Sequence, residues 1–286
     1  MFKKLIQSNK PLATMLIRAQ KEVFSSIVGN NNARTKGEGY DFVELRAYES
    51  GDDSKYIDWM ISSKVGKPHV KLFHQQKELN IKIVLFLGGS VYFGTKRLKQ
   101  ELITEISALI AYSCVKQNDP FEAYIANDDL LLAGKKSKQL FAVRSLVEKI
   151  SEYDVFGKKM NYRDIIGKLY KRLGQNSLLF LIGDFFDSKD LDLRALSLKH
   201  ELLVIIVRDR FEERPSELGN LDITDPSTLR CTKVNFTQTG LNSYIKKVRS
   251  EDEDFLLKLK KLGIRHVKIF TDENPAQKIF NIMSRR

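Results

Sequence analysis

From Asn80 onward, short apolar runs alternate with segments whose apolar residues recur every three or four positions. Nearly continuous apolar runs are typical of buried strands in parallel sheets, whereas the longer spacing predicts amphipathic helices. The predicted strands are Ile81–Leu87, Phe121–Ala126, Leu178–Ile182, Leu202–Val207 and Val267–Phe270. The predicted helices are Lys96–Lys116, Lys138–Ile150, Tyr162–Leu173, Ser188–Lys199, Thr237–Leu262 and Pro275–Met283. This alternation predicts an α/β fold with a doubly wound, mainly parallel sheet.

Two segments break the alternation. Leu130–Leu132 is expected to be a short hairpin partner of the preceding strand, and Arg208–Phe236 an irregular region with an antiparallel excursion that ends in Arg230–Phe236. Before residue 80, Pro11–Val28 has apolar positions close to helical period and predicts an amphipathic helix that packs on the main domain. Thr35–Leu79 predicts short strands and turns, so the expected organisation is an N-terminal helix and small β-rich region over 1–79, then an α/β domain over 80–286.

The segment Gly37–Phe73 mixes charged and aromatic side chains. Such mixing indicates an ordered segment in which opposite charges are paired. Arg46 and Lys55 are expected to pair with nearby aspartates, with the single tryptophan as a packing anchor. A second interpretation makes the same side chains a recognition surface, because arginine and tryptophan are common interface hot spots. The residues concerned are Arg46, Asp52, Asp53, Asp58 and Trp59.

The same segment carries an ordered motif. It reads G-x-G-Y-x-F-x-x-L-R-x-Y-x-x-G-D-D-x-x-x-I-D-W from Gly37 to Trp59, followed by Val70–Phe73 and Glu78. This pattern resembles the signature of the bacterial domain-of-unknown-function 58 family. The resemblance implies a von Willebrand factor A-like second half and a partnership with MoxR-type AAA+ ATPases.

In a doubly wound sheet, ligands bind beyond the carboxyl ends of the strands, at the switch point of the strand order. The loops there are Phe86–Gly94 and Gly183–Ser188. In von Willebrand factor A domains the first loop reads Asp-x-Ser-x-Ser, and later loops supply a threonine and an aspartate that bind Mg²⁺. Alignment on that motif puts Phe86 at the aspartate and Ser90 at the second serine. The alternative register puts Gly88 at the aspartate position.

The remaining positions of that motif match only in part. Asn161 is the best candidate for the threonine, and Asp184 matches the later aspartate, with Asp187 close by. Because a hard cation needs carboxylate oxygens, the missing aspartate predicts a degenerate site without bound metal. A second interpretation is that Asp184 and Asp187 cap a helix that starts near Ser188.

Charge leaves a second function class open. The chain has 48 Lys and Arg against 36 Asp and Glu, a formal net charge of +12. This excess permits nucleic-acid binding, which is the alternative function. The basic residues are dispersed, however, and a lysine-rich soluble surface explains them as well.

Catalytic motifs are absent from the sequence, which has no HExxH, CxxC, P-loop or GxSxG spacing. Two cysteines do not make a disulfide framework, and no apolar run is long enough for a membrane span. We therefore expect a cytoplasmic protein without enzymatic activity or cofactor. The expected function is that of an interaction or adaptor protein that acts with a MoxR-type AAA+ ATPase in assembling or remodelling a complex.

Overall fold

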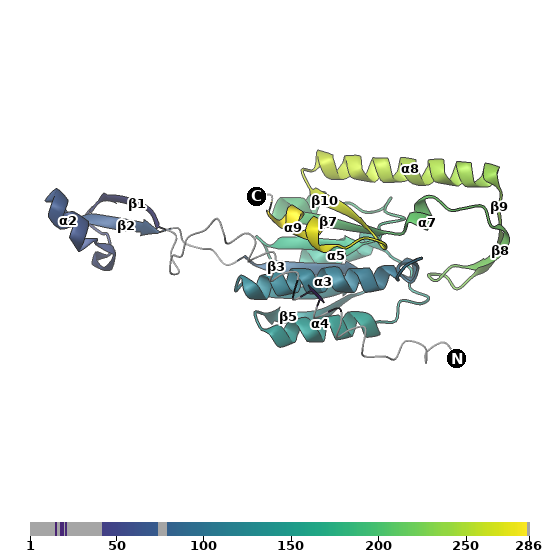
Figure 1. Cartoon of the computed structure of the whole chain (residues 1–286), viewed down its shortest axis with the longest axis horizontal. Helices are drawn as coiled ribbons and strands as arrows, with labels where there is room; N and C mark the ends of the chain where they lie inside the picture. The colour runs from purple at the N-terminus through teal and green to yellow at the C-terminus, as the bar shows by residue number, and fades with distance from the viewer. Residues whose placement is uncertain (1–14, 16–17, 20, 22–41, 74–78, 285–286) are drawn as a thin grey trace. The chain divides into compact units, whose positions relative to one another are not determined.

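The computed structural model describes residues 15, 18, 19, 21, 42–73 and 79–284. Contacts divide the chain into a larger unit, residues 79–286 with 1–26, and a smaller unit, residues 27–78. Figure 1 shows the elements of both, and each unit is described separately.

A six-stranded sheet forms the centre of the larger unit. Its strands in spatial order are β10 (Arg265–Phe270), β7 (Glu201–Arg208), β6 (Leu178–Gly183), β3 (Ile81–Phe86), β4 (Phe121–Ala126) and β5 (Leu130–Ser137). All neighbours are parallel except β4 and β5, which pair antiparallel. The predicted α/β fold with a doubly wound, mainly parallel sheet is confirmed. Every residue of β3 is buried, as its continuous apolar sequence requires.

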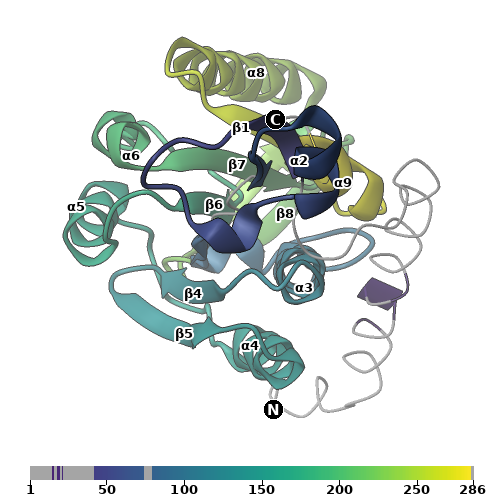
Figure 2. The same cartoon turned by 90° about the vertical axis from the view of Figure 1, so that its left-hand side faces the viewer.

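Helices cover both faces of this sheet, as Figure 2 shows. One face carries α3 (Lys99–Lys116), α4 (Leu140–Glu152) and α9 (Ala276–Ser284), and the other carries α5 (Tyr162–Arg172), α6 (Arg194–Lys199) and α8 (Gln238–Lys261). Helix α3 is buried almost all round because it contacts the sheet, α4 and α9. Its buried hydroxyls donate to carbonyls one turn earlier, as Thr104 does to Gln100 at 2.7 Å. This internal bonding lets a polar helix face be buried.

Two predicted segments differ from the structure. The helix expected from Ser188 begins only at Arg194, because residues 188–193 form a turn in which the Leu191 amide donates to the Ser188 carbonyl at 3.0 Å. The region after β7 contains the short helix α7 (Arg210–Glu213), which was not predicted. The expected antiparallel excursion is present as the hairpin β8 (Gly219–Thr224) and β9 (Cys231–Phe236).

The predicted N-terminal helix lies mostly outside the described residues. The four described positions, residues 15, 18, 19 and 21, are helical. Ala19 is fully buried, and the Arg18 guanidinium lies 3.7 Å from the Glu105 carboxylate of α3. Arg18 and Ala19 therefore pack against the rest of the larger unit.

The smaller unit pairs β1 (Phe42–Ala47) with β2 (His69–Phe73) and carries two short helices, η2 (Ser54–Tyr56) and α2 (Trp59–Val65). Helix α2 was not predicted. The Asp58 carboxylate caps its start by accepting the Ile61 amide at 3.0 Å, and Gly66 ends it with a φ of 73°.

Ion pairs stabilise this unit, and the predicted pairs of Arg46 and Lys55 are present. The Arg46 guanidinium lies 2.6 Å from Asp52, and the Lys55 ammonium lies 2.7 Å from Asp53. Asp58 instead pairs with Lys71 of β2, at 2.8 Å. The prediction that Trp59 is a packing anchor is wrong, since its side chain is 70% exposed, as is that of Met60.

We expect the two roles in this segment to separate by mutation. Trp59→Ala leaves the hydrogen-exchange protection of the β1–β2 amides unchanged, because an exposed ring contributes within about 0.5 kcal/mol to stability. Asp52→Ala lowers that protection, since Arg46 and the Glu49 amide both lose their acceptor. Equal loss of protection in both variants would show that the tryptophan packs after all.

A buried histidine makes the larger unit sensitive to acid. His200, at the end of α6, is 5% exposed, and its ring nitrogens have no hydrogen-bond partner among the described residues. Burial, with Lys82 and Lys199 nearby, lowers the pKa of His200 below 6.5. The unfolded chain therefore takes up this proton first as pH falls, and stability is lost from about pH 6.5 downward to the folded-state value.

His200→Leu removes this proton linkage. We expect the fall in melting temperature between pH 7.5 and pH 5.5 to be smaller in the variant by roughly 2 °C, on the scale of a partial proton uptake in a domain of this size. Calorimetric scans at the two pH values measure it. An unchanged pH slope would mean that His200 takes up its proton at the same pH in the folded and the unfolded protein.

Candidate functional site

The strand order reverses between β3 and β6, and the loops that follow these strands lie at the same edge of the sheet. In doubly wound sheets this edge is where ligands bind. Here it receives Ser90 from the loop after β3, Asp184 from the loop after β6, and Glu212 from α7 after β7. Polar groups from three separate elements therefore converge at the switch point.

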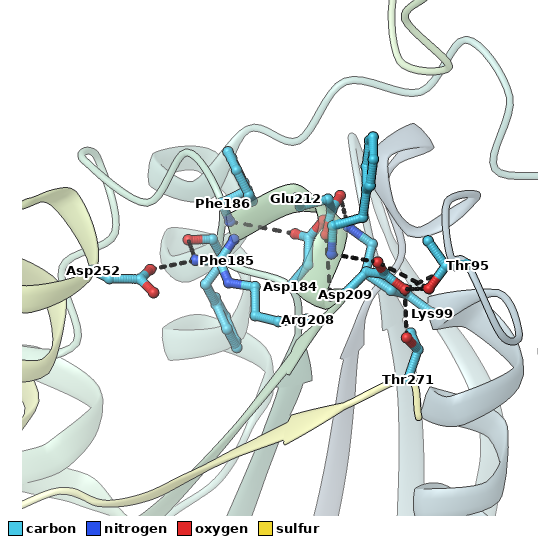
Figure 3. Close-up of polar contacts among 11 residues, drawn as sticks. Thr95, Lys99, Asp184, Phe185, Phe186, Arg208, Asp209, Glu212, Asp252 and Thr271 are labelled. Atoms are coloured by element: carbon cyan, nitrogen blue, oxygen red, sulfur yellow. Dashed lines mark hydrogen bonds and ion pairs between the residues drawn. The ribbon is translucent and has the colours of Figure 1, made fainter. Parts of the chain in front are cut away.

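A buried lysine forms ion pairs with side chains from two of these elements (Figure 3). Lys99 is the first residue of α3 and is fully buried. Its ammonium lies 3.1 Å from the Asp184 carboxylate and 2.5 Å from the Glu212 carboxylate. A cation at a helix start is disfavoured by the helix dipole. The two carboxylates supply the compensating charge, so this cluster of Lys99, Asp184 and Glu212 is the charged floor of the site.

The two carboxylates of this floor respond differently to burial. For Asp184, burial opposes ionisation, but Lys99, Arg208 and a Ser90 hydrogen bond outweigh it, and the pKa falls below its usual value. For Glu212, burial raises the pKa, and Lys99 offsets this only in part because Asp184 lies close. Asp184 is therefore the more firmly ionised partner of Lys99.

Asp209 connects three loops around the floor. It is fully buried and accepts hydrogen bonds from the Thr95 amide at 2.8 Å, the Phe211 amide at 2.9 Å and the Thr271 hydroxyl. The Thr95 hydroxyl is a further donor, at 3.0 Å (Figure 3). The loops after β3, β7 and β10 are thus held by one carboxylate.

Arg208 closes the other side of the floor. Its side chain is 2% exposed and pairs with Asp252 of α8 at 2.6 Å. Its guanidinium carbon lies 4.4 Å from the ring centroid of Phe186. Helix α8 is therefore joined to the loop after β6 through this arginine.

Above the floor lies a cavity of about 920 Å³. Ser90, Asp184 and Glu212 contribute to its base, while β8, β9 and the start of α8 contribute walls that include Ile223, Phe236, Leu241 and Tyr244. At Gly89, an added Cβ would lie 2.5 Å from the backbone of Pro226. Glycine there lets the loop after β3 approach the β8–β9 connection closely.

This arrangement of strands, floor and cavity can be compared with known proteins. The family described as "Protein of unknown function DUF58" matches residues 44–254, which is more than half of the chain. The chain belongs to the DUF58 family.

Relatives of this DUF58 protein include the uncharacterized protein Rv1480 of Mycobacterium tuberculosis and the uncharacterized protein Mb1516 of Mycobacterium bovis. Each is 23% identical over 222 residues, which span 75% of this chain and 69% of the relative. Among solved structures, the conserved hypothetical protein BatB from Bacteroides thetaiotaomicron is similar at a TM-score of 0.43 and 11% identity, covering 72% of this chain and 97% of BatB. An aerotolerance-related membrane protein from Bacteroides fragilis is similar at a TM-score of 0.42 and 9% identity, covering 72% and 96%.

Among the described residues of the DUF58 protein, no helix combines the length and apolar character that crossing a bilayer requires.

The structure brings together only some of the residues singled out in the sequence. Ser90 and Asp184 meet at the floor, and the exposed Asp187 lines the cavity. Asn161 is exposed and caps α5 by accepting the Asp164 amide at 3.2 Å. Phe86 packs in the core, 5.2 Å from Phe185 between ring centroids. The interpretation that Asp184 caps a helix starting near Ser188 is wrong, because no helix begins there.

A cation of the chain itself lies where the sequence suggested a degenerate metal site. Within the described part of the chain, no three His, Cys, Asp or Glu side chains are grouped as metal ligands. Asp184 instead faces the Lys99 ammonium. An ammonium and a divalent cation compete for the same carboxylate oxygens, so a metal at Asp184 would have to displace Lys99.

Sequence reasoning missed four members of this site, Lys99, Arg208, Asp209 and Glu212. One signal was available for the lysine, since it opens a helix whose dipole disfavours a positive charge. Arg208 and Asp209 directly follow the apolar core of β7, at the same sheet edge as Asp184. Polar residues at the carboxyl ends of neighbouring parallel strands are candidates for one site. Glu212 lies in the irregular region, where periodicity carries no signal.

Proposed function

We propose that this DUF58 protein is a non-enzymatic interaction protein that binds a protein partner in the cavity at the carboxyl edge of its sheet. The observation that carries the proposal is the combination of a large, mainly apolar cavity with a charged floor that is already neutralised by Lys99. Apolar concave surfaces at switch points are typical binding sites. A floor of this kind stabilises the loops without leaving a free base or nucleophile.

The chemistry at the floor supports a binding role over a catalytic one. Both carboxylates are engaged by one ammonium, and Ser90 bonds to Asp184 in a cavity whose described lining contains no histidine. A nucleophile needs an adjacent base, and a general acid–base pair needs a proton that can leave. Neither requirement is met by groups held in an ion-paired cluster.

We further propose that the larger unit is von Willebrand factor A-like and that its partner is a MoxR-type AAA+ ATPase. The strand order, with one antiparallel edge strand, supports the first point. The signature motif from Gly37 to Trp59, through the family resemblance, supports the second. In this proposal the Lys99 ammonium takes the position of the metal ion, and the adhesion site is degenerate.

The alternative of nucleic-acid binding finds less support at this cavity. Phosphate groups would meet Asp187 and Asp225 there, with Lys159 as the exposed cation of the lining. The negative charges of these carboxylates would repel the phosphates and oppose binding. A nucleic-acid role would therefore need another surface of the chain.

Ile223→Arg tests the proposed site. Ile223 lies on the cavity wall and is 37% exposed, so a long charged side chain fills the entrance at little cost to the core. We expect the variant to lose at least about 90% of the AAA+ ATPase that the unaltered protein captures from native lysate, on the scale of a disrupted hot spot. Capture with and without ATP, followed by mass spectrometry, measures the loss.

Leu218→Arg is the matched control, because Leu218 is 48% exposed just before the same hairpin and does not line the cavity. It should capture the partner normally. Equal capture by both variants would show that the partner does not bind in the cavity. Recovery of nucleic acid in place of an ATPase would favour the alternative, nucleic-acid binding.

A further inference from the structure

Aromatic rings make up a large part of the cavity wall. Six of its lining residues are aromatic, namely Phe93, Tyr162, Phe186, Phe211, Phe236 and Tyr244. The face of an aromatic ring attracts cations, and the attraction grows when water is excluded. Such walls accept an apolar body and favour a positively charged group at its end.

Lys99 and Arg208 of the chain itself already lie near some of these rings. The Lys99 ammonium lies 6.0 Å from the ring centroids of Phe93 and of Phe186, and Arg208 lies over Phe186. Among the described residues, no cation lies over the rings of Phe236 or Tyr244. These two rings, on β9 and α8, remain available to a ligand.

Carboxylates outnumber ammonium groups around the cavity. Asp184, Asp187, Glu212 and Asp225 line it, against Lys159 in the lining and Lys99 and Arg208 at the floor, where Arg208 is already paired with Asp252. This surplus contrasts with the net charge of +12 for the whole chain.

Asp187 and Asp225 are the carboxylates left for a ligand. Asp187 is exposed and makes no ion pair within the described part of the chain. Asp225 is tied to its own loop, accepting the Ser227 amide at 2.8 Å and the Thr228 hydroxyl at 2.7 Å. Although its burial opposes ionisation, these hydrogen bonds lower the pKa of Asp225, so it remains negatively charged.

We infer that the cavity binds a basic side chain, an arginine or a lysine, which a partner protein presents between apolar residues. The aliphatic stem lies along the aromatic walls, and the charged end faces Asp187 and Asp225. An acidic side chain is disfavoured there because its charge would meet the like charges of these carboxylates. The inference rests on the proposed function, since it names the chemistry of the partner at the same site.

Three fluorescein-labelled nonapeptides test it on the full chain. Their sequence is Ser-Gly-Ser-Leu-X-Leu-Ser-Gly-Ser, where X is arginine, glutamate or norleucine. Fluorescence anisotropy at low salt should show the arginine peptide binding at least tenfold more tightly than the glutamate peptide, with the norleucine peptide between them. Asp187→Lys should weaken the arginine peptide about fivefold, the scale of one partly exposed ion pair. The control Asp190→Lys, an exposed aspartate of the same loop that does not line the cavity, should not.

Equal binding of the three peptides, tighter binding of the glutamate peptide, or no detectable binding of the arginine peptide at millimolar protein would overturn the inference. The proposed function survives any of these results if Ile223→Arg still abolishes capture of the partner while Leu218→Arg does not. Loss of that contrast, with arginine preference retained, would instead leave a cation-binding cavity without the proposed partner.

Discussion

Replacing Lys99 by methionine lowers the free energy of unfolding by about 3–5 kcal/mol, the usual loss when one member of a buried ion pair is removed. Methionine matches the length of the lysine stem but leaves Asp184 and Glu212 without the ammonium that pairs with both of them. Both carboxylates are at most 16% exposed, so water cannot replace the ammonium fully. Denaturant unfolding followed by circular dichroism measures the loss.

Two further variants identify the cause of that loss. Lys96→Met removes an exposed lysine three residues earlier and should leave stability within about 0.5 kcal/mol of the original. Adding Asp184→Asn and Glu212→Gln to Lys99→Met should recover much of the lost stability, because no unpaired charge remains buried. A Lys99→Met protein as stable as the original would mean that the ammonium is not the cation that balances the floor.

Asp209→Ala is expected to cost roughly 2–4 kcal/mol, because several donors lose one buried acceptor together. The donors are the Thr95 amide and hydroxyl, the Phe211 amide and the Thr271 hydroxyl. The Thr95, Phe211 and Thr271 segments belong to three loops, so the loss also loosens the cavity floor. Urea unfolding measures the stability change.

Asp272→Ala is the matched control for this substitution. Asp272 lies one residue after Thr271, and its carboxylate is 35% exposed and pairs with Arg210 at the surface. Its removal should cost less than about 1 kcal/mol, as for other exposed ion pairs. Comparable losses in the two variants would show that Asp209 is not the residue that joins the loops.

The central strands could be predicted because burial on both faces leaves a continuous apolar run. Ile81–Phe86 and Glu201–Arg208 lie in the middle of the sheet, and their sequences are apolar almost throughout. The strand order was not predicted, but Asp184 directly follows a predicted strand, at the carboxyl edge where doubly wound sheets bind ligands. The fold class and the sheet edge that carries the candidate site could therefore be predicted from the sequence.

The sequence did not predict that Lys99 is the partner of Asp184. Sequence patterns assign a lysine to solvent by default, and burial of Lys99 depends on two carboxylates distant in the chain. These pairings have sequence separations of 85 and 113 residues. Periodicity reports only local geometry, so contacts of this separation carry no local signal.

Trp59 illustrates the opposite error. A single tryptophan among charges suggested a buried anchor, since large aromatics bury much apolar surface. In the structure the surrounding charges pair among themselves, Arg46 with Asp52 and Asp58 with Lys71, and the ring stays exposed. The sequence predicted the pairs of Arg46 and Lys55, but neither the Lys71 partner of Asp58 nor the exposed position of the tryptophan on α2.

Site-specific photo-crosslinking tests the cavity as the binding site most directly. A benzophenone-bearing phenylalanine analogue replaces Tyr244, which lines the cavity and is 38% exposed, or Phe141 of α4, which is 72% exposed and does not line it. Irradiation in native lysate should crosslink an AAA+ ATPase through position 244 and not through position 141. Crosslinking through position 141 alone, or equally through both positions, would contradict the assignment of the cavity as the partner-binding site.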